Sequence, residues 1–139
     1  MRNMSTEDEI LKASHLVAIV VLSSNPKQPS HIVASYLKVN GYKIIPVNPN
    51  EKSILEETSY PNLVSITQRV DVIDIFKRSE DVLPIVRNTI RIGTKAVWMQ
   101  EGITNKEAAD IAQRAGLKLI MDRCMLKENQ RLEGHTTSK

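Results

Sequence analysis

The stretch LVAIVVLSSNPKQPSHIVASYLKVNGYKIIPVNPN, residues 16–50, decides the fold of this chain. It opens with an unbroken apolar run, 16–22, whose β-branched residues are typical of a strand buried on both faces of a parallel sheet. A polar loop, 23–30, follows, and its two prolines prevent a helix from beginning before the end of the loop. Apolar residues then recur at helical spacing as far as Gly41, and a second apolar run, 43–47, completes a βαβ unit.

Three later apolar runs predict three more strands, each preceded by a polar or helical segment. These runs are 70–76, 95–99 and 117–121. Strands that alternate with helices indicate an α/β fold, here a single Rossmann-like three-layer domain in which a five-stranded parallel sheet carries helices on both faces. We expect the strand order 3-2-1-4-5, as in doubly wound sheets.

Helix starts are predicted from capping patterns. Thr6 and Thr104 each have a glutamate three residues later, which is the spacing of a capping box. Ser79 precedes two acidic residues and an apolar stripe, so it is the predicted N-cap of the helix that ends near Gly93.

Composition predicts one domain in a reducing compartment. The 139 residues are 41% hydrophobic, which is ordinary for a single globular domain. We expect a helix in residues 1–15 that packs on the domain, the domain itself in 16–132 and a flexible tail in 133–139. A single cysteine argues against a disulfide framework, and the acidic N-terminus does not resemble a signal peptide, so the expected location is cytoplasmic.

Several function classes are disfavoured by what the sequence contains. The net charge of +3 suits an anionic ligand, but one Trp, three Tyr and one Phe are too few for a nucleic-acid stacking platform. No apolar segment approaches the roughly 18 residues that span a bilayer. The three histidines are far apart, so no metal site is expected. Asp71 and Asp74 are three residues apart in a predicted strand, so they point to opposite faces and do not form an acid/base pair.

The loop after the first strand is the predicted anion site. Backbone N–H groups in the first turn of a helix lack internal partners, and the helix dipole adds positive charge there. The loop contains no glycine, so the dinucleotide fingerprint G-x-G-x-x-G is absent. Asn48 stands where a nicotinamide dinucleotide's ribose would meet an acidic residue. Ordinary NAD binding is therefore disfavoured, whereas a phosphate-bearing ligand is not.

A ligand crevice is expected where the predicted chain order reverses, between the first and fourth strands. The loop 23–30 should then face 100–102 across the crevice. Phe76 and Arg78 follow the third strand at the same edge, where Arg78 suits a phosphate and Phe76 suits either a ligand or the core. Trp98 lies inside the fourth strand and is predicted to pack in the core.

The loop pattern S-x-x-P-x-x-P-S, followed by GYKIIPVNP, VDVIDIFKRSEDV, KAVWMQEGI and GLKLIMDRC, resembles the small stand-alone CoA-binding proteins. Those proteins are similar to the CoA-binding domain of the succinyl-CoA synthetase α subunit, and the resemblance runs from about Val17 to Leu132. It implies a Rossmann-like fold and coenzyme A as the ligand. The ADP part would lie over the loop, the adenine near Val47 and Asn48, and the pantetheine arm past Phe76 and Gln100.

The candidate cofactor-binding residues come partly from this resemblance and partly from their position at the sheet edge. They are Ser23, Asn25, Pro26, Gln28, Ser30, Asn48, Pro49, Lys52, Phe76, Arg78, Gln100 and Cys124. The chain departs from the family at Val21, where glycine is usual, and at Gln28, where arginine is usual. Both changes point to weaker or altered binding, because Val21 hinders close backbone approach and Gln28 removes a bidentate phosphate donor.

Cys124 supports a separate hypothesis. It lies beside Arg123 at the ligand edge, and neighbouring positive charge favours a thiolate, so a mixed disulfide with the CoA thiol is conceivable. A structural role is the more common one for a single cysteine.

The leading prediction is a module that binds CoA or an acyl-CoA as a carrier, sensor or sequestering protein without its own catalysis. The alternatives are a nucleotide-dependent enzyme or ligase component, and a thiol-based redox or regulatory protein that acts through Cys124. We expect neither nucleic acid nor membrane as a partner. A homodimer or another protein partner remains open, because the edges of a small parallel sheet need cover.

Overall fold

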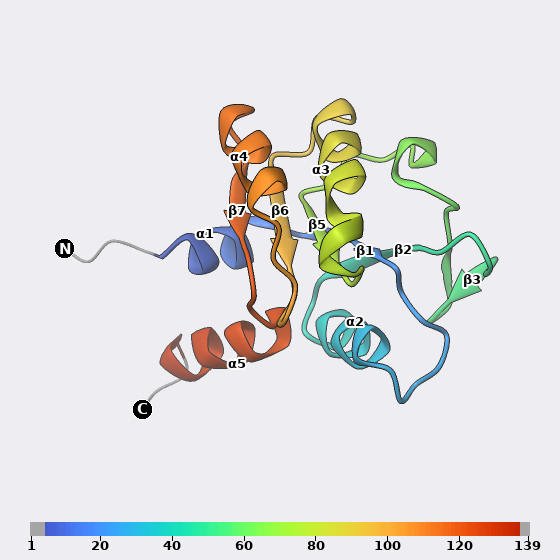
Figure 1. The fold of residues 1–139 in the computed structure, drawn as a ribbon. Coiled ribbons are helices and arrows are strands. Elements are labelled where there is room, and N and C mark those ends of the chain that lie inside the picture. Colours follow the sequence, from blue (N-terminus) through green and yellow to red (C-terminus); the bar gives the residue numbers. More distant parts are fainter. Residues whose placement is uncertain (1–4, 137–139) are drawn as a thin grey trace.

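A computed structural model describes residues 5–136 of the chain (Figure 1). Its elements, in chain order, are α1 (Thr6–Ala13), β1 (Leu16–Val20), α2 (Pro29–Val39), β2 (Lys43–Val47), β3 (Ser53–Ile54), β4 (Glu57–Thr58), the short 3-10 helix η1 (Leu63–Ser65), β5 (Val72–Ile75), the 3-10 helix η2 (Ser79–Asp81), α3 (Val82–Arg91), β6 (Ala96–Met99), α4 (Lys106–Arg114), β7 (Lys118–Ile120) and α5 (Met125–Thr136). No helix in this described part combines the length and apolar character needed to cross a membrane.

Five parallel strands form one sheet with helices on both faces, which confirms the predicted α/β, Rossmann-like three-layer fold. Alternate strand residues pack on opposite faces. Val17, Ile19 and Trp98 face the layer of α1, α2 and α5, whereas Ala18 and Ile73 face α3 and α4 (Figure 1). Trp98 has no exposed surface, so its predicted core position is also confirmed.

The predicted strand order is wrong at one point. From edge to edge the order is β2-β1-β5-β6-β7, so the third strand of the main sheet lies beside β1 and not beyond β2. Pro46 explains this position, because a proline inside β2 has no N–H to donate and is tolerated mainly in an edge strand. The outer side of β2 is covered instead by the segment that carries the β3–β4 hairpin, where the N–H of Tyr60 donates to the carbonyl of Pro46 at 3.0 Å.

The predicted caps are displaced from their helices. Ser5 and not Thr6 caps α1, and Asn105 and not Thr104 caps α4; each side-chain oxygen accepts a hydrogen bond from the N–H three residues on, at 3.1 and 2.9 Å. Ser79 caps no helix, because the chain forms η2 before α3 begins. Its hydroxyl accepts from the N–H of Thr104 at 3.1 Å and so joins the loops that follow β5 and β6.

Helix α5 follows the last predicted strand, and its buried face contains a polar residue. Asn129 is 2% exposed in the middle of this face. Its side-chain oxygen accepts from the Tyr36 hydroxyl at 2.6 Å, and its amide donates to the Tyr42 hydroxyl at 3.1 Å. The Asn129 amide thus bonds the hydroxyl groups of Tyr36, in α2, and Tyr42, just after it. Helix α5 is therefore held against the rest of the domain by these hydrogen bonds as well as by apolar packing.

The expected boundary between the domain and its C-terminal tail falls inside a helix, whereas the expected N-terminal segment contains a helix that packs on the core. Within the expected N-terminal helical segment, Ile10 and Leu11 join the core, and residues 1–4 lie outside the described part. The expected boundary at 132 falls inside α5, which continues to Thr136. The rest of the expected tail, 137–139, lies outside the described residues.

The start of β1 is attached to the start of β5 by one carboxylate. The Oδ2 atom of Asp71 accepts from the N–H groups of His15 and Leu16 at 2.8 and 2.9 Å. Asp71 lies at the amino edge of the sheet, whereas Asp74 is buried within β5. The two carboxylates therefore do not meet, in agreement with the sequence.

Replacing Asp71 with alanine should lower the free energy of unfolding by about 2 kcal/mol, because two N–H groups lose a charged acceptor. Urea denaturation of Asp71→Ala measures this change. Asp110→Ala, on the exposed side of α4, is the matched control and should stay within about 0.5 kcal/mol of wild type. Equal losses in the two variants would contradict the role of Asp71.

Candidate functional site

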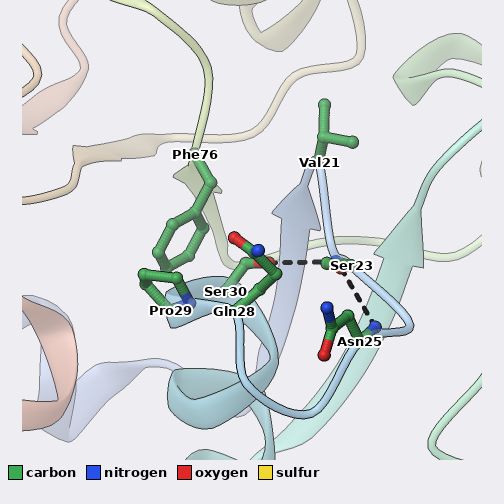
Figure 2. A pocket seen from close by; sticks show the side chains of 7 residues that line it. All are labelled: Val21, Ser23, Asn25, Gln28, Pro29, Ser30 and Phe76. Atoms are coloured by element: carbon green, nitrogen blue, oxygen red, sulfur yellow. Dashed lines mark hydrogen bonds between the residues drawn. The ribbon is translucent and has the colours of Figure 1, made fainter.

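The crevice of the sheet lies between β1 and β5, because the chain leaves β1 toward β2 and returns on the other side to β5. This corrects the expected position between the first and fourth strands, and the correction follows from the changed strand order. The loop 23–30 leaves β1 at this point, and Phe76 leaves β5 beside it (Figure 2).

The loop 23–30 is held in shape by its own side chains. The Ser30 hydroxyl accepts from the N–H of Ser23 at 2.9 Å, and the Ser23 hydroxyl accepts from the N–H of Asn25 at 3.0 Å (Figure 2). The His31 ring lies 2.8 Å from the Ser23 carbonyl through its Nδ1 atom. The two ends of the loop are therefore bonded to each other, and the start of α2 is placed against the end of β1.

The loop borders an open cavity of about 430 Å³, which we call the loop cavity. Its lining residues are Val21, Ser23, Asn25, Gln28, Pro29, Ser30 and Phe76. Pro29 occupies the first turn of α2, and the N–H of Ser30 makes no hydrogen bond within the described residues. This free donor and the positive end of the helix dipole make the cavity suitable for an anion.

Figure 2 shows the Phe76 ring directed toward Pro29 and Gln28, whereas the Val21 side chain points away from the loop. A second cavity of about 270 Å³, the inner chamber, lies on the other side of Phe76. It is lined by Pro29, Val33, Phe76, Gln100, Glu101, Ile103 and Cys124. Because Pro29 and Phe76 line both cavities, the loop cavity and the inner chamber adjoin, and the expected meeting of the loop with residue 100 is observed.

A third cavity of about 320 Å³ adjoins the loop cavity at Val21, and we call it the hairpin-side cavity. Its lining residues are Val20, Val21, Val47, Pro49, Asn50, Pro61, Asn62, Leu63, Lys77, Ile85 and Asn88. Lys77 makes no hydrogen bond or ion pair within the described residues, so its charge is available to a ligand. The three cavities together follow the carboxyl edge of the sheet from β2 to β6.

Beneath the inner chamber lies a carboxyl group with no exposed surface. Gln100 donates from Nε2 to one oxygen of Asp74 and accepts at Oε1 from the N–H of Met125 at 3.4 Å, so the amide links β5 to the start of α5. The other oxygen of Asp74 has no hydrogen-bond partner in the described residues. Burial raises the pKa of Asp74 from its ordinary 3.8 to about 8, and the hydrogen bond from Gln100 opposes that rise. Asp74 is therefore mainly protonated at neutral pH.

Four of the predicted site residues line none of these three cavities: Pro26, Asn48, Lys52 and Arg78. Asn48 is buried and donates to the Leu22 carbonyl at 2.8 Å, so it positions the loop. The Arg78 side chain is 75% exposed and pairs with Asp81 at 3.0 Å. Lys52 is exposed. The other eight line at least one of the cavities: Ser23, Asn25, Gln28, Ser30, Pro49, Phe76, Gln100 and Cys124.

Sequence reasoning missed Lys77, Asn50 and Asn88, which line the hairpin-side cavity. The sequence analysis placed the neighbours Phe76 and Arg78 at this edge and assigned a phosphate contact to Arg78, but Arg78 pairs with Asp81 and Lys77 lines the cavity. Pro46 is the sequence signal for the observed strand order, because it marks β2 as an edge strand and so brings β5 beside β1.

Cys124 is half-buried on the wall of the inner chamber, directly before α5. The neighbouring Arg123 side chain lies 3.9 Å from the Glu7 carboxylate, so its charge already has a partner. The described residues contain no cluster of metal ligands.

Comparison with known proteins is informative once this geometry is known. The CoA binding domain family matches residues 15–130. The uncharacterized protein YneT of Bacillus subtilis (strain 168) is 33% identical over 127 residues, which cover 90% of this chain and 94% of that protein. A hypothetical protein from Pyrococcus horikoshii OT3 has a solved structure with a TM-score of 0.87 and 33% identity, covering 95% of this chain and 94% of that one.

A larger relative is an enzyme. The ADP-forming acetate–CoA ligase II of Archaeoglobus fulgidus is 29% identical over 116 residues. The match covers 75% of this chain but 17% of the ligase, so this chain corresponds to one part of that enzyme.

Asp74 predicts an unusual pH dependence of stability. Below pH 3.8, the ordinary pKa of the group, the Asp74 carboxyl is protonated in both the folded and the unfolded protein. As the pH rises, the unfolded chain loses this proton, whereas the folded chain keeps it until about pH 8. Its contribution to stability therefore falls throughout this window. The side chain of Asp74→Asn cannot ionise, so the variant does not lose this stability. From about pH 5 to pH 8, the unfolding free energy of the variant minus that of wild type should rise by on the order of a few kcal/mol.

Urea denaturation at several pH values measures this difference. Asp110→Asn, on the exposed side of α4, is the control and should show no such trend. A constant difference between Asp74→Asn and wild type across the pH range would mean that Asp74 ionises normally.

Proposed function

The chain belongs to the CoA binding domain family, and from this premise we propose that it binds coenzyme A or an acyl-CoA at the carboxyl edge of its sheet. We propose that it acts as a carrier, sensor or sequestering module without catalysis of its own. The observation that carries this proposal is the run of three adjoining cavities along that edge, centred on the loop after β1.

Coenzyme A consists of a phosphorylated adenosine, a pyrophosphate and a pantetheine arm, and each part has a suitable surface. The adenosine would occupy the hairpin-side cavity, between Val47 and Pro49. The pyrophosphate would lie in the loop cavity, and the arm would pass Phe76 into the inner chamber toward Gln100. This path runs across the sheet in the direction that the resemblance implies.

The phosphates would be held mainly by neutral donors. The free N–H of Ser30 and the dipole of α2 favour an anion in the loop cavity, and Lys77 supplies a cation from the adjoining side. None of the residues that line the loop cavity is charged, because Gln28 stands where family members usually have arginine. We therefore expect binding that is weaker than a site with an arginine would allow.

A ligase component is the second candidate, favoured by the similarity to part of the Archaeoglobus ligase. In that role the chain would present the coenzyme to a catalytic partner protein. The thiol-based alternative depends on Cys124 alone and has no further support.

Titration with CoA should stabilise the protein against heat. A ligand at about a hundred times its dissociation constant adds roughly 2.7 kcal/mol, which corresponds to a rise on the order of 8 °C in Tm for a chain of this length. Differential scanning fluorimetry with CoA, acetyl-CoA, NAD, NADP and ATP measures the shift. A response to CoA and acetyl-CoA but not to NAD is the expected result, and no response to CoA and acetyl-CoA would contradict the proposal.

Gln28→Arg should tighten CoA binding roughly fivefold to tenfold, because the new guanidinium adds a charged phosphate donor at the loop cavity. Isothermal titration calorimetry measures the change. Gln113→Arg, on the exposed side of α4, adds the same charge far from the loop and should leave the affinity within about twofold of wild type. Equal effects in both variants would indicate general electrostatic attraction instead of a phosphate contact at residue 28.

A further inference from the structure

The inner chamber has a different character from the other cavities along the edge. Apolar side chains of Val33, Phe76 and Ile103 form most of its wall, together with the half-buried Cys124. The chamber lies beyond Phe76 as seen from the loop cavity, so a ligand arm that passes Phe76 ends there. An apolar cavity at the end of the path favours an apolar group over water.

The polar groups of the chamber are acidic or already bonded. Gln100 is 3% exposed, and both ends of its amide are occupied by Asp74 and by the N–H of Met125. Glu101 is the charged residue of the lining. No lysine or arginine lines the chamber among the described residues.

Lys127, a cation on α5, pairs with this acid. Lys127 Nζ lies 3.1 and 3.2 Å from the two carboxylate oxygens of Glu101, so its charge is already paired. A carboxylate that entered the chamber would therefore lose water, meet the Glu101 carboxylate and find no unpaired cation among the described residues of the lining. An uncharged alkyl group would meet none of these penalties.

Building on the proposed function, we propose that the inner chamber receives the acyl group of an acyl-CoA. In this assignment it favours short uncharged acyl groups over free CoA and over acyl groups that end in a carboxylate. The physiological ligand would then be a thioester of a short monocarboxylic acid. Ile103 and Glu101 would set the selectivity, Ile103 through the volume of the chamber and Glu101 through its charge.

The first test is a series of dissociation constants for CoA, acetyl-, propionyl-, butyryl- and succinyl-CoA, measured by calorimetry on the wild-type protein. Burial of each added methylene contributes about 0.8 kcal/mol, which corresponds to a roughly fourfold gain in affinity per methylene and about fifteenfold from acetyl to butyryl. Succinyl-CoA, which has the same carbon chain length as butyryl-CoA, should bind at least tenfold more weakly than butyryl-CoA.

The outcomes separate the two proposals. Binding of CoA without any gain along the acyl series, or binding of succinyl-CoA as tight as that of butyryl-CoA, would overturn the acyl assignment and leave the proposed function standing. Absence of binding by all five ligands would overturn the proposed function and the acyl assignment with it. Affinity that rises from CoA to butyryl-CoA and falls for succinyl-CoA would support both the proposed function and the acyl assignment.

Variants locate the selectivity within the molecule. Ile103→Trp fills the chamber, so the affinities for butyryl-CoA and CoA should become nearly equal. Ile103→Ala enlarges the chamber, so the preference should move to longer acyl groups. The control is Ile32→Trp on the outer side of α2, where the isoleucine is 49% exposed, and its acyl series should match wild type. An unchanged series in Ile103→Ala would overturn the assignment of the chamber.

Glu101→Gln removes the acidic charge and releases Lys127, so succinyl-CoA should gain about tenfold relative to butyryl-CoA. Glu107→Gln, at the exposed start of α4, is the matched control and should leave the ratio unchanged. The same gain in both variants would show that net charge, and not the chamber, discriminates between the two ligands.

Discussion

The structure depends on the burial of β1 on both faces and both edges. Val17, Ala18 and Ile19 have no exposed surface, so every peptide group of this strand needs a partner inside the protein. Parallel pairing with β2 on one side and β5 on the other supplies those partners, and Asp71 adds two bonds at the start of the strand. The helices on the two faces then exclude water. Because the strand is held on all sides, the loop at its carboxyl end leaves from a rigid support.

This support explains why the site lies where it does. The strand order reverses at β1, so the connections that follow β1 and β5 lead to α2 and α3 on opposite faces of the sheet and leave a crevice beyond the ends of the two strands. The loop 23–30 bonds its two ends together through Ser23 and Ser30 and so places the start of α2 over the crevice. Phe76 divides the space into a polar part around the loop and an apolar part toward α5.

Hydrogen bonds join Asp74, Gln100 and the start of α5 at the buried side of the inner chamber. A carboxyl group with no exposed surface is tolerated in the centre of the sheet because it remains protonated and because Gln100 donates to it. The same glutamine accepts from the backbone of Met125 and lines the inner chamber, so the position of α5 and the shape of the chamber are coupled. The family is that of a CoA binding domain, and under the proposed function these contacts mark the end of the site that would hold the thiol, opposite the end that would hold the phosphates.

The sequence by itself determined the α/β class, the five strands of the main sheet and the loop at the carboxyl edge, because each depends on local patterns of apolar residues, prolines and helix caps. It also identified Phe76, Gln100 and the loop serines as neighbours of one crevice. The exact caps were displaced by a residue, since Ser5 and Thr6, or Thr104 and Asn105, offer similar side-chain oxygens.

Tertiary structure alone decided the strand order, the packing of α5 and the division of the crevice into three cavities. These features arise from contacts between distant segments, such as Asn129 with the hydroxyls of Tyr36 and Tyr42 and Gln100 with Asp74, which no local pattern encodes. For the same reason only the structure shows that Lys77, and not the neighbouring Arg78, lines a cavity at this edge. Local propensity specifies which segments are strands and helices, whereas the satisfaction of buried polar groups specifies which of them become neighbours.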